Sequence, residues 1–100
     1  MTQPLVSVIC LCYNHEEYVI RSLNSVINQS YKNIELIIVD DKSTDNSTQI
    51  IDEWIKKNPN VIKIYNKINL GNTKSFNNAA KLATGAYLVD LAADDILLTN

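Results

Sequence analysis

Two pairs of neighbouring aspartates are the residues whose type and spacing point most directly to chemistry. Asp40 and Asp41 follow an apolar run, and Asp94 and Asp95 follow the last strand-like segment of the chain. Carboxylates that are brought together repel one another unless a cation or hydrogen-bond donors compensate their charge. Because oxygen ligands suit hard divalent cations, the pattern predicts a site for Mg²⁺ or Mn²⁺.

The first pair closes a segment that is typical of a buried strand. Residues 34–39 are mostly apolar, and a cluster of small polar residues follows the two acids. Such a run favours a strand in the interior of a parallel sheet, and open α/β sheets bind ligands at the carboxyl ends of their strands. A solvated turn with a helix cap is the alternative, since Asp, Ser and Thr are also the usual residues of caps and turns.

Strand-like and helix-like segments alternate along the chain. Apolar stripes at helical spacing predict helices, the first capped by Asn14 and the last ended by Gly85. Apolar runs predict strands at residues 5–12, 34–39, 61–65 and 87–92. This alternation calls for a three-layer α/β/α fold with an open, Rossmann-like parallel sheet. The first two strands are the most apolar and the third is short and polar, which predicts the strand order 3-2-1-4.

In this order the direction of winding reverses between the first and fourth strands, and their carboxyl ends become the predicted binding crevice. Residues 11–14 and both aspartate pairs would meet there. The chain has neither of the two familiar glycine-rich loops that cradle phosphates with backbone amides. A metal ion that bridges diphosphate oxygens would neutralise a bound nucleotide instead.

The composition bounds the class of protein. With 100 residues, 46% of them hydrophobic, and a formal charge of −2, the chain is predicted to form one domain, the N-terminal part of a longer one. It lacks the clustered Lys and Arg of a nucleic-acid-binding surface. No window reaches the roughly 18 apolar residues of a transmembrane segment, and residues 1–4 do not resemble the start of a signal peptide. We therefore expect a cytoplasmic protein, with peripheral attachment to the inner face of the membrane left open.

Several short motifs, in this order and spacing, resemble the inverting glycosyltransferases of the largest nucleotide-sugar family, family 2, which have the GT-A fold. The resemblance covers nearly the whole chain. The residues that carry it are 7–14, Ser25, 29–31, 35–45 with the core Asp-Asp-x-Ser-Thr-Asp, Asn69, Gly71, Asn77 and 85–95.

The resemblance implies a role for five residues at the predicted crevice. In the family, the end of the first strand stacks on the nucleobase, a role that falls on Leu11 and Tyr13. The second acid of the Asp-Asp pair, here Asp41, would hydrogen-bond the base. In the element after the fourth strand, Asp94 would contact the ribose and Asp95 the metal that holds the diphosphate.

Three positions depart from the family pattern. Ala92 stands where the first acid of the Asp-x-Asp element is expected, and Asp90 stands where an apolar residue is usual. Phe76 replaces a frequent arginine, so Lys74 becomes the nearest cation that could contact the nucleotide. A lysine on an exposed helix face is the alternative interpretation of Lys74.

The resemblance implies transfer of a sugar from a nucleoside-diphosphate sugar, with a UDP-sugar expected, to a hydroxyl acceptor with inversion. Saccharides or lipid-linked acceptors would place the reaction in cell-surface polysaccharide or glycoconjugate synthesis. The family's general base lies after the residues present here, so the chain alone is predicted to be inactive, and a homodimer is left open. The alternatives are a non-catalytic nucleotide-binding or interaction module of the same fold and a receiver-like signalling domain.

Two further features have structural explanations of their own. His15 could act as a base, but a single histidine beside a helix start is more often a solvated cap residue. Cys10 and Cys12 share one face of the first strand without a second pair that could complete a zinc site, and we expect buried free thiols.

Overall fold

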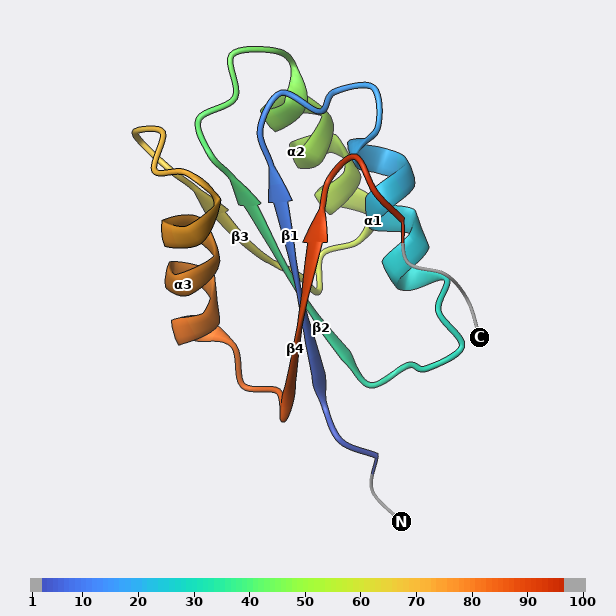
Figure 1. Ribbon diagram of the computed structural model, residues 1–100. Helices are drawn as coiled ribbons and strands as arrows, with labels where there is room; N and C mark the ends of the chain where they lie inside the picture. The colour runs from blue at the N-terminus through green and yellow to red at the C-terminus, as the bar shows by residue number, and fades with distance from the viewer. Residues whose placement is uncertain (1–2, 97–100) are drawn as a thin grey trace.

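The computed structural model describes residues 3–96, which form four strands and three helices in alternation (Figure 1). In chain order the elements are β1 (Val6–Cys12), α1 (Val19–Ile27), β2 (Ile34–Asp40), α2 (Ser47–Lys57), β3 (Ile62–Tyr65), α3 (Asn72–Leu82) and β4 (Tyr87–Ala92). Each predicted element is present, with ends that differ by a few residues. Among the described residues, no helix has the length and apolar character needed to cross a membrane.

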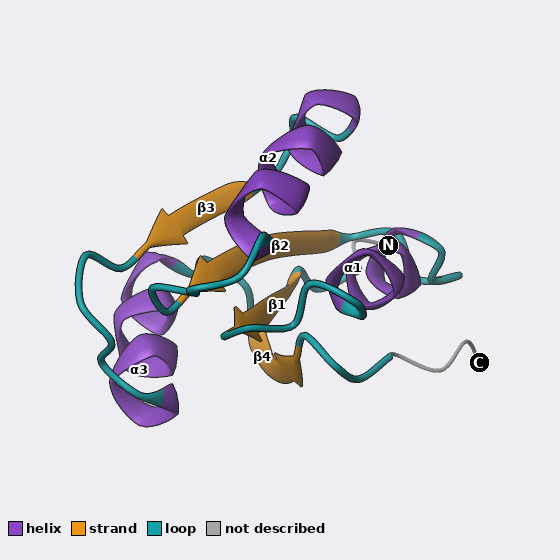
Figure 2. Ribbon diagram, turned by 90° about the horizontal axis from the view of Figure 1, so that it is seen from above, coloured by secondary structure: helices purple, strands orange, loops and turns teal. Residues whose placement is uncertain are grey.

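The strands form one parallel sheet in the order β3-β2-β1-β4, which confirms the predicted topology. Helices cover both faces, with α1 and α2 on one side and α3 on the other (Figure 2). The pleat of β1 divides its side chains between these layers, because successive residues of a strand point to opposite faces. Val8 and Cys10 pack toward α1 and α2, whereas Ile9 and Leu11 pack in the cluster with Ala79 of α3.

The two outer strands differ from the two inner ones in burial. β1 and β2 are almost entirely buried, as expected for strands with a neighbour on each side. β3 is half-buried, in agreement with its prediction as an edge strand. On β4, Leu91 packs into the core, but Leu88 and Asp90 on the opposite face are exposed. This face of β4 is therefore exposed to solvent beside the predicted crevice.

The prediction that Asn14 caps the first helix is wrong. α1 begins at Val19, and its N-cap residue is Tyr18. Asn14 instead has a positive φ of 56°, a conformation that Asn tolerates better than most residues. Its side-chain Oδ1 accepts hydrogen bonds from the backbone N–H groups of Thr44, at 2.7 Å, and Asp45, at 3.3 Å. The amide is therefore used to join two loops rather than to start a helix.

The prediction that Gly85 ends the third helix is also wrong. α3 ends at Leu82 and its C-cap residue is Ala83. Gly85 lies instead against β1, where its N–H donates to Ser7 Oγ at 2.9 Å. A Cβ on Gly85 would lie 2.5 Å from Ser7 Oγ and 2.7 Å from Ser7 N, so the glycine is needed for close approach of two backbones.

We expect Gly85→Ala to lower the free energy of unfolding by about 1–3 kcal/mol, because the added methyl group meets the backbone of a central strand. Urea unfolding of the purified protein measures this loss. Gly71→Ala is the control, since a Cβ at Gly71 meets no atom within 4 Å and would report only the cost of its positive φ of 85°. A Gly85→Ala variant as stable as the original protein would contradict the proposed crowding.

Candidate functional site

A cleft of about 260 Å³ opens at the carboxyl ends of β1 and β4, where the direction of winding reverses. This is the place that the strand order predicts for a ligand. Its lining residues come from both strands, from the loop after β1, from the start of α3 and from the turn after β4. They are Leu11, Tyr13, His15, Asn72, Asp90, Ala92 and Asp95. The structure therefore brings together three of the predicted site residues, Leu11, Tyr13 and Asp95.

Leu11 and Tyr13 give the cleft an apolar surface. Leu11 is buried, with only 8% of its surface exposed, because it packs in the core cluster on the α3 side of the sheet. Tyr13 lies just beyond the end of β1 and is 42% exposed. An exposed aromatic ring beside a buried leucine offers a flat surface on which a planar ring can stack.

Asp41 does not line this cleft, although it is close in sequence to the end of β2. It is 5% exposed and lies against residues 66–71, the loop before α3. Its Oδ1 accepts hydrogen bonds from Leu70 N, at 2.7 Å, and Asn66 Nδ2, at 2.9 Å. Its Oδ2 accepts one from Gly71 N, at 2.9 Å. The carboxylate thus fixes the loop that leads into α3, and a ligand N–H must approach beside these donors or replace one of them.

The environment of Asp41 favours its charged form. Burial raises the pKa of the carboxyl, but the hydrogen bonds from the loop outweigh this effect, and the pKa lies below its ordinary value of 3.8. Asp41 is therefore an anion near neutral pH, able to accept hydrogen bonds but not to donate them.

Asp40, the first acid of the pair, is used inside the protein. It is 1% exposed, and its carboxylate accepts hydrogen bonds from Ser43 N at 2.8 Å and Ser43 Oγ at 2.5 Å. For this residue the turn interpretation is correct, and Asp40 closes the bend that follows β2.

The loops after β1 and β2 are joined by side chains that the sequence analysis did not assign to the site. Besides the bonds of Asn14, Ser47 Oγ accepts a hydrogen bond from His15 N at 3.1 Å, and Asp45 Oδ2 accepts one from Glu16 N at 3.1 Å. Burial raises the pKa of Asp45, but its hydrogen bonds, those with Ser47 first, have the larger effect and bring the pKa below its ordinary value. The carboxylate is therefore charged near neutral pH. The joined loops hold Tyr13 and His15 at the cleft.

Asp94 and Asp95 lie on a tight turn at the end of β4. Asp95 N donates to Ala92 O at 2.9 Å, which closes the turn, and Ala93 N donates to Leu11 O at 2.9 Å, which ties it to β1. Both acids are exposed, but only Asp95 lines the cleft. Asp94 faces the loop after β1, with its Oδ2 3.8 Å from His15 Nε2.

The donor set fits a divalent cation that is bound together with a diphosphate. Within residues 3–96, no group of three or more His, Cys, Asp or Glu side chains could hold a metal ion. Asp95 offers hard carboxylate oxygens at the cleft, and Asp94 is its neighbour on the same turn. Mg²⁺ is commonly held by one or two protein carboxylates, with substrate phosphates and water as its other ligands. One or two aspartates at the cleft are therefore enough protein ligands for such a site.

Lys74 is exposed on the first turn of α3 and does not line the cleft, whereas Asn72 from the same helix does. His15 does line it, and within the part of the chain that the structure describes its buried Nδ1 has no hydrogen-bond partner. Cys10 and Cys12 are buried free thiols, as predicted. Burial raises the pKa of Cys10 to about 12 and that of Cys12 to about 11, so neither thiol is a reactive nucleophile.

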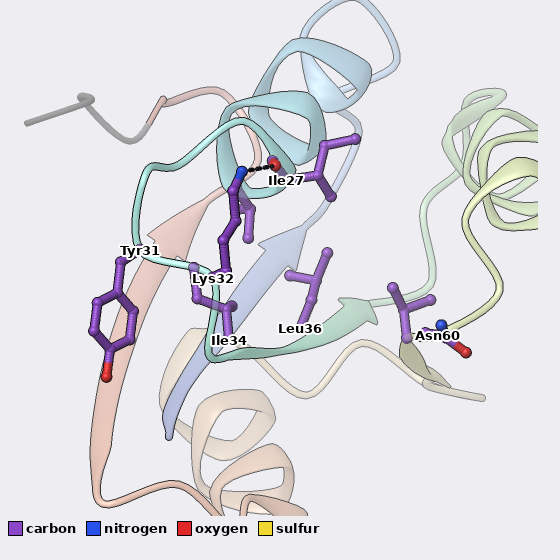
Figure 3. Close-up of a pocket in the computed structure, with 8 residues that line it drawn as sticks. Ile27, Tyr31, Lys32, Ile34, Leu36 and Asn60 are labelled. Atoms are coloured by element: carbon purple, nitrogen blue, oxygen red, sulfur yellow. Dashed lines mark hydrogen bonds between the residues drawn. The ribbon is translucent and has the colours of Figure 1, made fainter. Parts of the chain in front are cut away.

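A second pocket, of about 220 Å³, lies at the amino end of β2, far along the strand from the acids (Figure 3). Its labelled side chains are mainly apolar, and the ammonium group of Lys32 turns back to donate to Ile27 O at 3.4 Å. No carboxylate lines this pocket, so it does not provide the chemistry that the sequence predicts.

The parallel sheet of order 3-2-1-4 is a Rossmann-like fold, and solved glycosyltransferases of the GT-A type share it. The model of one family, described as Glycosyl transferase family 2, matches residues 7–100. The chain belongs to this family.

A curated relative and two solved structures are similar to nearly all of the chain. The UDP-Glc:alpha-D-GlcNAc-diphosphoundecaprenol beta-1,3-glucosyltransferase WfaP of Escherichia coli is 39% identical over 96% of the chain. The mannosyltransferase PcManGT of Pyrobaculum calidifontis, in complex with GDP-Man and Mn²⁺, is 26% identical over 95% of the chain, with a TM-score of 0.88. TarS of S. aureus, in complex with UDP-GlcNAc, is 33% identical over 92% of the chain, with a TM-score of 0.82.

The chain is much shorter than the proteins that it matches. It spans 38% of WfaP, and 29% and 27% of the PcManGT and TarS chains. The other leading curated relatives are likewise covered over well under two thirds of their length.

Proposed function

We propose that this chain is the nucleotide-binding part of a glycosyltransferase that passes a sugar from a nucleoside-diphosphate sugar, preferentially a UDP-sugar, to a hydroxyl acceptor with inversion. The observation that carries the proposal is the cleft at the switch point, which combines the apolar surface of Leu11 and Tyr13 with the carboxylate of Asp95. The ligands in the structures of PcManGT and TarS, GDP-Man and UDP-GlcNAc, are both nucleotide sugars and support this donor class. The lipid-linked acceptor in the name of WfaP supports a role in cell-surface polysaccharide or glycoconjugate synthesis.

Each residue that the sequence assigned to the site has a role in this proposal, including those that do not line the cleft. Tyr13 and Leu11 orient the nucleobase by stacking, and Asp41 accepts a hydrogen bond from it. Asp94 accepts hydrogen bonds from the ribose hydroxyls. It is exposed and is the neighbour of Asp95, which is assigned to the metal and the diphosphate. Lys74 would contact the nucleotide only if its flexible side chain folds back toward the cleft.

Mn²⁺ or Mg²⁺ would be held by Asp95, and it would neutralise the diphosphate as that group leaves. The carboxylate of Asp95 would orient the leaving group only through that cation, because two anions repel one another, and the joined loops after β1 and β2 keep Tyr13 in place. Inversion requires one general base to take the proton of the acceptor hydroxyl. We propose that this base and the acceptor site lie after residue 100, in the part of the relatives that the chain does not span.

It follows that residues 1–100 alone bind the donor weakly and transfer no sugar. Transfer by this chain to an added acceptor would show that the base is present, and His15 and Asp90, which line the cleft, would then be tested first. Conversely, a full-length protein that binds the donor but neither transfers nor hydrolyses it would support a non-catalytic nucleotide-binding module.

The nucleobase preference tests the role of Asp41. A carboxylate only accepts hydrogen bonds, so it needs an imide-type N–H on the base. Uracil, thymine and guanine offer one, whereas cytosine and adenine do not. We expect UDP, dTDP and GDP to bind about 1–3 kcal/mol more tightly than CDP and ADP, or about 5- to 150-fold in Kd. Calorimetry with the five diphosphates measures this difference, and equal affinities would remove the base contact from the proposal.

A further inference from the structure

Ser22 is a buried hydroxyl in an otherwise apolar stripe of α1. It is 1% exposed and lies among Val19, Leu23 and Val26, which face the sheet. A hydroxyl in such a place is unfavourable unless it is hydrogen-bonded. Its partners do not belong to α1, because Ser22 Oγ donates to Ala93 O at 2.8 Å and also contacts Asp95 O. The helix is thereby connected to the turn after β4, more than 70 residues away along the chain.

The turn that Ser22 contacts carries the two exposed acids of the site. Its backbone is fixed from three directions: by its own closing bond from Asp95 N to Ala92 O, by the bond from Ala93 N to Leu11 O on β1, and by Ser22 on α1. The side chains of Asp94 and Asp95 are exposed, and Asp95 Oδ1 accepts a hydrogen bond from the backbone N–H of Ile96 at 3.0 Å. The place of Asp95 at the cleft is therefore set by the backbone of the turn and of the residue that follows it.

We propose that Ser22 is a positioning residue for the metal-diphosphate site, which it serves by holding the backbone of the turn at Asp95. The proposal rests on the proposed function, in which Asp95 holds the metal. A divalent cation of the Mg²⁺ type requires close to ideal coordination, and such a site functions only when its ligands are held to within about 0.5 Å. Without the hydroxyl, Ala93 O loses a buried donor and the turn can settle in another position.

Ser25 provides a matched control on the same helix. Its Oγ donates to Ser22 O, a backbone acceptor within α1, at 2.6 Å. Ser22→Ala and Ser25→Ala therefore remove the same group from one helix, and the first of them removes the hydrogen bond to Ala93 O in the acidic turn. Ser22→Thr keeps a hydroxyl at the position.

The experiment compares these variants in the full-length protein. Calorimetry gives the affinity for UDP with Mn²⁺, for UDP with a chelator, and for uridine. We expect Ser22→Ala to reduce the Mn²⁺-dependent gain in UDP affinity by about 10- to 100-fold, the loss typical of residues that orient metal ligands. Uridine affinity should fall much less, by about twofold, because only the proposed ribose contact of Asp94 lies on the turn, whereas Tyr13 and Asp41 hold the base from outside it. Ser25→Ala should change neither value, and Ser22→Thr should restore most of the gain.

Amide hydrogen exchange without any ligand provides an independent readout. Loss of the Ser22 hydroxyl should speed exchange at Asp95 N, whose bond to Ala92 O closes the turn, by about tenfold or more relative to Ser25→Ala.

The outcomes separate this inference from the proposed function. If the original protein gains UDP affinity from Mn²⁺ and Ser22→Ala gains as much, the positioning role is wrong while the function stands. A proportional loss of uridine and UDP affinity in Ser22→Ala would assign Ser22 a general structural role and would also overturn the inference. If Mn²⁺ gives the original protein no gain at all, the proposed metal site is wrong. Faster amide exchange at Asp95 in Ser22→Ala would then still show that the Ser22 hydroxyl holds the backbone of the turn.

Discussion

Asp95→Asn is expected to abolish the metal-dependent part of the affinity for UDP while leaving the affinity for uridine nearly unchanged. Asp95 is the acid of the turn that lines the cleft, and its carboxylate supplies the charge that a divalent cation needs. An amide keeps the size of the side chain but removes that charge. Mutation of residues that only orient metal ligands typically lowers metal affinity about 10- to 100-fold. For the ligand itself we expect the affinity for UDP with Mn²⁺ to fall on the order of 100-fold. Titrations of UDP with Mn²⁺ and with a chelator measure it.

Asp90→Asn is the matched control, because Asp90 lines the same cleft but lies on β4 itself, away from the turn. This variant should keep the metal-dependent gain. The assignment of Asp95 fails if chelation leaves the UDP affinity of the original protein unaltered, or if the Asp90 and Asp95 variants lose the gain equally.

Asp41→Asn is expected to weaken uridine and UDP alike and also to destabilise the fold. The carboxylate accepts hydrogen bonds from Asn66 Nδ2 and from the backbone N–H groups of Leu70 and Gly71. An amide turns one accepting oxygen into a donor that faces another donor. Hydrogen bonds to a charged group contribute about 1.5–3 kcal/mol each, so we expect the free energy of unfolding to fall by about 3 kcal/mol. Denaturant unfolding at neutral pH measures this change.

The difference in the free energy of unfolding between the original protein and Asp41→Asn should depend on pH, and its sign follows from the lowered pKa of Asp41. A carboxyl with a lower pKa in the folded state stabilises the fold fully above its ordinary pKa of 3.8, and this contribution is lost as the pH falls through the folded-state pKa. The stability gap between the original protein and Asp41→Asn should therefore narrow below about pH 4.

Asp52→Asn is the control for the stability of Asp41→Asn, since the half-buried Asp52 carboxylate accepts hydrogen bonds from the side chains of Tyr65, at 2.6 Å, and Lys63, at 3.3 Å. An ion pair near the surface contributes little, and an amide oxygen can still accept the bond from Tyr65 OH, so we expect a loss of about 1 kcal/mol or less. A similar loss in both variants would mean that Asp41 does not fix the loop.

The fold could be predicted because its signals are local. The continuous apolar character of β1 and β2, and the polar character of β3, follow from how many neighbours each strand has, and this property fixed the predicted strand order. The cleft was predicted for a related reason, because parallel strands deliver their carboxyl ends to one edge of the sheet.

The errors and omissions at the site concern contacts between segments that are distant in the sequence. Asn14 has the same local preference for helix caps and for turns, and its partners lie 30 or 31 residues away. The family resemblance implied that Asp41 contacts a nucleobase, but its place at a strand end did not reveal its bonds to the loop before α3. Ser22 resembles any polar residue of an amphipathic helix until the turn after β4 is in view.

The central position of β1 sets the order in which the sheet can be completed. β1 is the first strand of the chain, yet one of its two neighbours is β4, which pairs Tyr87 with Val6. Pairings between distant segments form slowly, and until β4 arrives one edge of β1 presents unpaired backbone groups that another chain can bind. The cleft does not exist before this step, since β1 and β4 each form part of its wall. Under the proposed function, nucleotide would bind only afterwards, and by mass action it would then hold β4 in place. In that case the cell's supply of sugar donor would also protect the newly made chain from aggregation.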